Sequence, residues 1–151
     1  MSESYRQTMG RKVVSRASAQ ELGPVSDLLY DARRRRISGL VLGHGRKARI
    51  VDWSQVSGFG PDAIMVSDDD ALREPAGERE EQAGKGKLSL VGARVLTEKG
   101  NEIGTVDDIV FDPADGSVVA LLLGDRELPA TALLGAGSYA AVVSADQDTA
   151  I

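Results

Sequence analysis

The charged side chains that stand out in the sequence are four consecutive arginines, Arg33–Arg36. Adjacent guanidinium groups repel one another unless solvent or an anionic partner screens them. The run therefore indicates a solvated turn, a contact for an acidic protein surface, or a site for nucleic acid or anionic lipid. Only Tyr30 and Trp53 are nearby for base stacking, so we do not expect sequence-specific binding of single-stranded RNA. We favour a solvated turn first, a protein contact second, and nucleic acid or anionic lipid last. The candidate interaction residues are Arg33, Arg34, Arg35, Arg36, Arg46, Lys47 and Arg49.

Catalytic chemistry has little support in the sequence. There is no cysteine, and His44 is the only histidine, placed between two glycines. No Gly-x-Ser-x-Gly element accompanies it, as a serine hydrolase of that type would require. Gly43–Ala48 fits a glycine-rich dinucleotide pattern, but the following Arg49–Val51 is typical of a strand and not of the helix that binds phosphate. We predict no enzyme activity, no catalytic residue and no cofactor.

Two further features have a structural and a functional interpretation. Asp107, Asp108, Asp112 and Asp115 cluster as calcium ligands do, but the alternating spacing of an EF-hand is absent. We therefore expect the last two to accept backbone N–H groups in a hairpin turn, and we predict no metal. Trp53, the sole tryptophan, either closes one end of a small barrel or forms a ligand platform, and we favour the first.

The elements that would position these residues occur twice. Leu22–Asp31 aligns with Ile103–Asp112 at an offset of 81 residues. The alignment continues without a gap, so that Ile37–Gly43 matches Val118–Gly124. Short β-branched runs alternate with turn residues every 8–12 positions or so, which favours β-strands. The chain therefore contains two copies of a β unit of roughly 60 residues. Shorter matches flank this core, Gly10–Val14 with Gly92–Leu96, Asp52–Val56 with Ala130–Leu134, and Gly58–Ala63 with Gly135–Ala140.

Charge divides the 151 residues into three parts. Residues 1–67 have a net charge of +5, residues 68–87 of −3 and residues 88–151 of −7. We expect a basic unit at residues 10–67, a flexible acidic linker at 68–87 and an acidic unit at 88–145. The longest apolar run, Val118–Leu123, is too short to span a bilayer, and the first residues lack an apolar signal segment. These observations predict a soluble, cytoplasmic protein without a membrane span.

The second copy resembles the PRC-barrel domain, through the Gly-x-Val-x-Asp-Ile-x-Phe-Asp-Pro run at residues 104–113 followed by Gly116 and Leu121. The first copy keeps much of this pattern but has Ala32–Arg36 at the turn. The resemblance covers about three quarters of the chain, which looks like the stand-alone tandem PRC-barrel proteins of bacteria. It implies an all-β fold of two tandem small, SH3-like barrels.

The resemblance also implies a class of function. PRC-barrel domains occur in the photosynthetic reaction centre H subunit and in ribosome maturation factor M, and they share no catalytic residues. We therefore expect a protein-interaction module, an adaptor or scaffold, that binds a protein partner or self-associates through barrel surfaces. The alternative is an RNA- or ribosome-associated assembly factor that uses the basic Arg33–Arg36 face.

Overall fold

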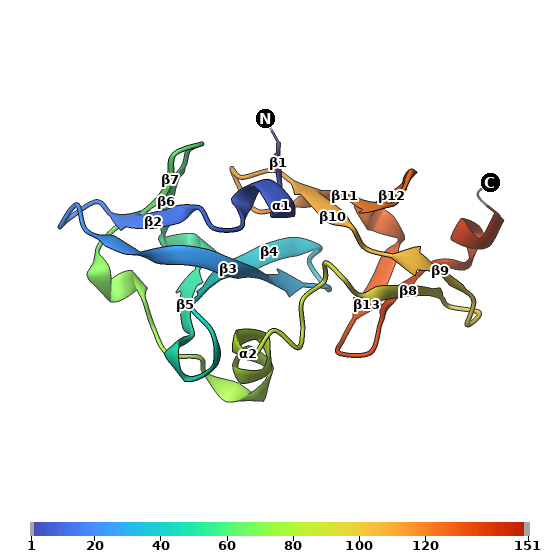
Figure 1. The fold of residues 1–151 in the computed structure, drawn as a ribbon. Helices are drawn as coiled ribbons and strands as arrows, with labels where there is room; N and C mark the ends of the chain where they lie inside the picture. The colour runs from blue at the N-terminus through green and yellow to red at the C-terminus, as the bar shows by residue number, and fades with distance from the viewer. Residues whose placement is uncertain (1, 150–151) are drawn as a thin grey trace.

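The computed structural model describes residues 2–149 and is built mainly of β-strands (Figure 1). The N-terminal half forms a six-stranded sheet in the order β5-β4-β3-β2-β7-β6. Its longest strand, β3, joins the two parts of this sheet, since it pairs with β2 at its first residues and with β4 at its last. The strands are β2 (Lys12–Ser15), β3 (Glu21–Asp31), β4 (Arg36–Leu42), β5 (Arg49–Asp52), β6 (Val56–Phe59) and β7 (Ala63–Val66).

The C-terminal half forms two four-stranded sheets, in the orders β1-β10-β11-β12 and β13-β14-β8-β9. One strand of the first sheet, β1 (Glu3–Ser4), comes from the N-terminus and pairs with β10. The N-terminus is therefore joined to the C-terminal half by main-chain hydrogen bonds. The other strands are β8 (Arg94–Thr97), β9 (Glu102–Thr105), β10 (Asp108–Phe111), β11 (Val118–Leu123), β12 (Arg126–Pro129), β13 (Leu133–Ala136) and β14 (Ala141–Val143).

Strand pairings recur between the two halves. In the N-terminal half β2 is antiparallel to β3, with Val13 opposite Gly23, and parallel to β7. In the C-terminal half β8 is antiparallel to β9, with Val95 opposite Gly104, and parallel to β14. Each antiparallel pair has a bulge directly after this position. Residues at offsets of 81 or 82 thus occupy matching places in the sheets.

Most of the core is one continuous apolar cluster that includes residues of both halves, and Val41, Ala48 and Ile50 form a second, small cluster. Aliphatic side chains dominate it, since only 4% of the residues are aromatic. Val13 and Leu40 of the N-terminal half and Leu121 and Leu133 of the C-terminal half are completely inaccessible to solvent. The prediction of a mainly β chain is confirmed, and the halves share apolar packing.

The helices are short and lie at the junctions between strands. α1 (Tyr5–Thr8) follows β1, and α2 (Gly77–Gly84) lies between the two halves. Among the residues that the structure describes, no helix is both long and apolar enough to cross a membrane. Single 3₁₀ turns complete the fold, at η1 (Gly45–Lys47), η2 (Trp53–Gln55), η3 (Asp69–Ala71), η4 (Ala130–Ala132) and η5 (Ala145–Thr149).

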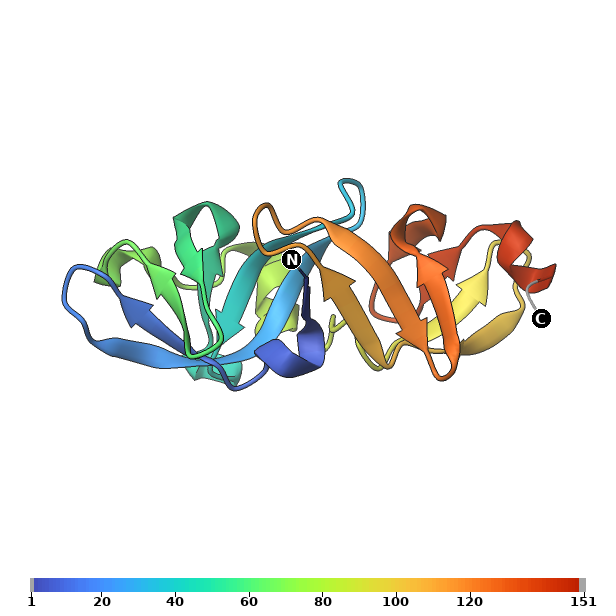
Figure 2. The ribbon, with the colours of Figure 1, turned by 90° about the horizontal axis from the view of Figure 1, so that it is seen from above.

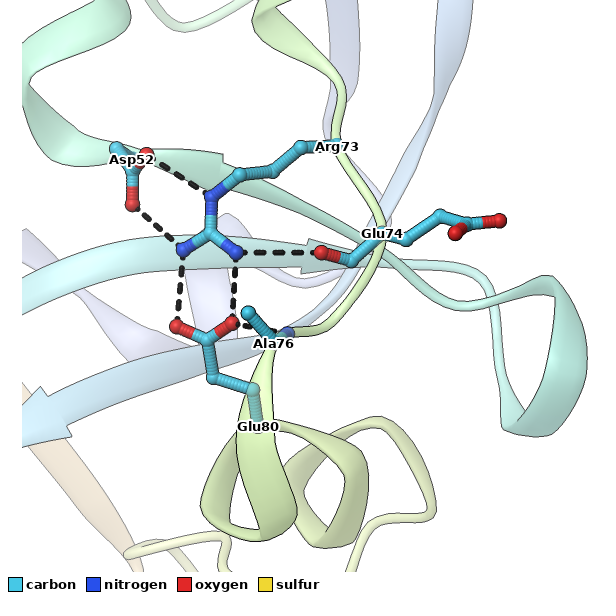
Figure 3. Close-up of polar contacts among 5 residues, drawn as sticks. All are labelled: Asp52, Arg73, Glu74, Ala76 and Glu80. Atoms are coloured by element: carbon cyan, nitrogen blue, oxygen red, sulfur yellow. Dashed lines mark hydrogen bonds and ion pairs between the residues drawn. The ribbon is translucent and has the colours of Figure 1, made fainter.

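Residues 68–87, which we expected to form a flexible linker, are folded onto the N-terminal half. Arg73 fastens them, because its guanidinium contacts the carboxylates of Asp52 and Glu80 at 2.7–3.0 Å (Figure 3). Its main chain also exchanges two hydrogen bonds with Ile50. The Arg73 hydrogen bonds hold the pKa of the Glu80 carboxyl below its usual range. The expectation of a flexible linker is therefore wrong. The composition of this segment indicated many charged residues, but it did not show that Arg73 is paired with Asp52 and Glu80.

Candidate interaction surface

The two halves meet at their hairpin tips, which extend toward each other at the centre of the molecule (Figure 2). Ile37 N–H donates to the Gly116 carbonyl at 2.7 Å, and Val118 N–H donates to the Arg35 carbonyl at 2.9 Å. Ile37 matches Val118 and Arg35 matches Gly116 in the repeat. The two bonds are therefore related by a local twofold symmetry. We call this junction, residues 35–37 and 116–118, the seam.

Two of the four arginines are used in the seam and not in a free surface. Arg35 is half-buried, and its Nε–H donates to the Leu133 carbonyl at 3.2 Å. Arg36 donates to the Asp115 carbonyl at 2.5 Å. Arg33 and Arg34 remain exposed, although Arg34 is 4.0 Å from Asp31. The predicted four-arginine surface is thus reduced to Arg33 and Arg34.

The second basic group, Arg46, Lys47 and Arg49, lies near the end of β4 that is opposite Arg36. Arg49 pairs with Leu42, whereas Arg36 is at the other end of β4. Six residues of strand separate these ends by roughly 20 Å. Arg49 is also engaged, donating to the Ala48 carbonyl at 2.8 Å and lying 3.9 Å from Glu74. This group, in which Arg46 and Lys47 are exposed, thus lies apart from the arginine tip.

Large apolar side chains are exposed only in the C-terminal half, within the part of the chain that the structure describes. Val119 is 55% exposed, Leu134 51% and Tyr139 70%. Sequence reasoning did not single these residues out. Their equivalents in the N-terminal half were the available signal, because all three are polar: Ser38, Ser57 and Asp62.

Val119 and Leu134 lie beside the seam. Val119 follows Val118, which donates to Arg35, and Leu134 follows Leu133, which accepts from Arg35. Both side chains are thus within one residue of a group that holds this arginine. Tyr139 is in the β13–β14 turn, where the Arg94 guanidinium stacks 4.6 Å from its ring centre. We call Val119, Leu134 and the exposed Arg33 and Arg34 the seam surface.

Trp53 packs across the seam. Its ring centre is 5.8 Å from that of Phe59 and 6.1 Å from that of Phe111 in the other half. It also covers Gly116, where a Cβ would lie 3.3 Å from the indole. The sequence alignment of this segment is shifted by one, because the matching turns η2 and η4 place Trp53 opposite Ala130. These contacts assign Trp53 a packing role.

The acidic residues considered as metal ligands accept backbone N–H groups. Asp112 accepts from Ala114 and Asp115 from Ser117, both at 2.9 Å, as expected of turn residues. Asp108 accepts from Arg6 and Ile109. Within residues 2–149 no three potential ligand side chains are grouped for a metal ion.

Asp27 is a buried carboxylate that sequence reasoning passed over. It is 6% exposed and accepts from the Tyr5 hydroxyl at 2.9 Å and from Leu28 N–H at 2.8 Å. Burial raises the pKa of this carboxyl above its usual range, and these hydrogen bonds offset only part of the shift. Its match with Asp108 in the repeat was the signal available. It joins α1 to β3, which is a structural task.

Comparison with known proteins agrees with this picture. The PRC-barrel domain model matches residues 89–151, and no curated protein matches the chain. PRC-barrel domains are generally non-catalytic. The matched region begins before β8 and contains all strands from β8 to β14. Residues 89–151, the C-terminal half, are therefore similar to the PRC-barrel domain.

Proposed function

We propose that the chain is a non-enzymatic protein-interaction module, an adaptor or scaffold, built from two PRC-type barrels at residues 10–67 and 88–145. The recurring strand pairings and the twofold seam support the tandem arrangement. A cytoplasmic location stays a prediction from composition.

One observation carries this proposal: the C-terminal half exposes Val119 and Leu134 where the N-terminal half has serines. Isolated apolar residues on a surface are ordinary, but each of these two directly follows a residue that is hydrogen-bonded to Arg35. Burying such side chains against a partner contributes roughly 25 cal/mol per Å² of apolar area. We assign the seam surface to a protein partner with an apolar centre and an acidic rim that faces Arg33 and Arg34.

The test makes the C-terminal half resemble the N-terminal half. The double change Val119→Ser and Leu134→Ser should leave folding intact, because both side chains are exposed. Proteins captured from native lysate by the full chain should be retained at least ~10-fold less by this variant. Tyr139→Asp, which copies Asp62 away from the seam, is the matched control. Equal capture by the double variant and the parent would contradict the proposal.

The RNA- or ribosome-associated alternative depends on the arginine tip. Arg33 and Arg34 are exposed there, but Arg35 and Arg36 donate to carbonyl groups of the other half. Each phosphate neutralised on duplex nucleic acid adds about −0.9 to the salt slope, so this tip supports only weak binding. If the purified protein retains nucleic acid, seen as a raised ratio of absorbance at 260 and 280 nm, and loses it in high salt, this alternative would be favoured.

A further inference from the structure

A cavity of about 210 Å³ lies between α2, β3 and the β13–β14 turn. Apolar groups make much of its wall, including Leu88, Leu90, Ala93 and Ala136, and Tyr30 and Arg79 add polar groups. We call it the Ala136 cavity. It is formed by both halves and by the segment that joins them.

In the repeat, the equivalent place in the other half is filled. Ala136 matches Phe59, because β13 and β6 end at these two residues. The glycine that follows begins the same turn in both halves, since Gly137 N–H donates to the Ala140 carbonyl as Gly60 N–H does to that of Ala63. Tyr30 matches Phe111 at the offset of 81. The Phe59 and Phe111 rings meet edge to face at 5.7 Å. Tyr30 instead faces the space beside Ala136.

A second substitution enlarges the same space. Ala93 matches Arg11, since Ala93 donates to Leu90 as Arg11 donates to Thr8. The Arg11 guanidinium stacks 5.1 Å from the Phe59 ring centre. One side of the molecule thus holds a ring covered by a cation, and the other side has two alanines there. The Ala136 cavity has the place and shape of a missing aromatic ring.

Its size is sufficient for such a ring. An apolar cavity of about 150 Å³ binds benzene in a protein interior. The Ala136 cavity is somewhat larger, which leaves room for a small substituent on the ring. An aromatic guest would contact the Tyr30 ring as Phe59 contacts Phe111.

The polar groups indicate the charge of the guest. Arg79 donates to the Tyr30 carbonyl, and among the described residues no carboxylate lies within 4 Å of its guanidinium. Its remaining N–H groups can bind a carboxylate in the bidentate manner. The Tyr30 hydroxyl is buried without a hydrogen-bond partner in this part of the chain, and burial raises its pKa to about 12, so it remains a donor.

We propose that the Ala136 cavity binds a small aromatic carboxylate, with its ring in the place that Phe59 takes in the other half and its carboxylate at Arg79. Such a ligand would touch both halves and α2. Its binding would therefore stabilise their association, in addition to any role of the seam surface.

The test uses the full chain and benzoate, with benzyl alcohol as the uncharged ring of similar size. We expect saturable binding of benzoate below ~1 mM by calorimetry, a raised melting temperature, and at least ~10-fold weaker binding of benzyl alcohol. Absence of saturable benzoate binding would overturn the proposal. Equal affinity for the two probes would overturn the assignment of an acid.

Two variants locate the site. Ala136→Phe should fill the cavity as Phe59 does and abolish benzoate binding, whereas Thr131→Phe adds the same ring at an exposed position outside the cavity and should not. Arg79→Gln should weaken benzoate by at least ~10-fold and leave benzyl alcohol nearly unchanged. Unaltered benzoate binding by both Ala136→Phe and Arg79→Gln would place the ligand elsewhere. Should Ala136→Phe fail to fold, Arg79→Gln decides alone.

Discussion

The two halves share one strand plan but differ in how they fill the two sides of the seam. On one side the large Trp53 covers Gly116, where no side chain competes for space. On the other side the matching residues are Ala130 and Arg35, and the long arginine reaches past to Leu133. On the first side the N-terminal half thus contributes the large Trp53 at one repeat position, and on the second side it contributes the large Arg35 at the other. The C-terminal half has a small residue, Ala130 or Gly116, at both of these positions.

This difference favours unlike halves. Two copies of the N-terminal half would place Arg35 against Trp53 twice, and two copies of the C-terminal half would place Gly116 against Ala130 twice. The first arrangement is crowded, and the second leaves voids that cost packing energy. Complementary sizes therefore select the pairing within one chain, although the backbone contacts of the seam are symmetric.

The largest effect should come from removing the aromatic side of this comparison. Phe111 is fully buried between Phe59 and Trp53, so Phe111→Ala should lower the free energy of unfolding by about 3–5 kcal/mol. Tyr30→Ala, at the matching position, should cost at least ~1 kcal/mol less, because it faces a cavity and its buried hydroxyl is unpaired among the described residues. Urea unfolding of both variants measures the difference. Equal losses would show that the two sides are packed alike.

Gly116→Val should have the next largest effect. Gly116 has a φ of +80°, and a Cβ there would lie 2.7 Å from the Ile37 carbonyl oxygen and against Trp53. We expect a loss of at least ~2 kcal/mol, from backbone strain and the clash together. Gly100→Val is the matched control, since Gly100 has a φ of +88° but open space around it. Similar denaturation midpoints for the two variants would contradict a clash at the seam.

The sequence was informative where local chemistry determines the backbone. Gly116 has the positive φ that a hairpin turn of this kind requires. The PRC-barrel resemblance, carried by residues such as Gly104 and Asp108, is confirmed for the C-terminal half. Gly104 has a φ of +149° and a Cβ on it would lie 3.3 Å from Leu123, which explains why a glycine belongs in this pattern.

The sequence was less informative where contacts join distant segments. Arg35 adopts a φ of +52° at the place of Gly116, a conformation that costs a non-glycine residue about 1–2 kcal/mol. Nothing local predicts this, since the compensating bonds come from Val118 and Leu133. The pairing of β1 with β10 connects positions more than 100 residues apart for the same reason. The charged residues at 68–87 indicated a solvated segment. The sequence did not show that Arg73 pairs with Asp52, which lies outside that segment.

Asp27 should make stability depend on pH. Its folded-state pKa is raised by burial, so the protonated form is favoured in the folded chain, and stability falls as pH rises through that pKa. Asp27→Asn keeps the shape without the charge. The stability of this variant relative to the parent should therefore be highest at neutral pH and decrease toward about pH 4. Urea midpoints at several pH values measure this change, and a constant difference would contradict it.

The smallest effect is expected at the exposed end of the arginine run, and it separates a surface role from a packing role. Replacing Arg33 and Arg34 with serine should change the free energy of unfolding by less than about 0.5 kcal/mol, because both are exposed and the Arg34–Asp31 pair is long. Replacing Arg35 and Arg36 removes two contacts between the halves and should cost more. If partner capture is lost only with the first pair, the seam surface binds through these cations. Loss of stability with the first pair would instead make the whole run a structural element.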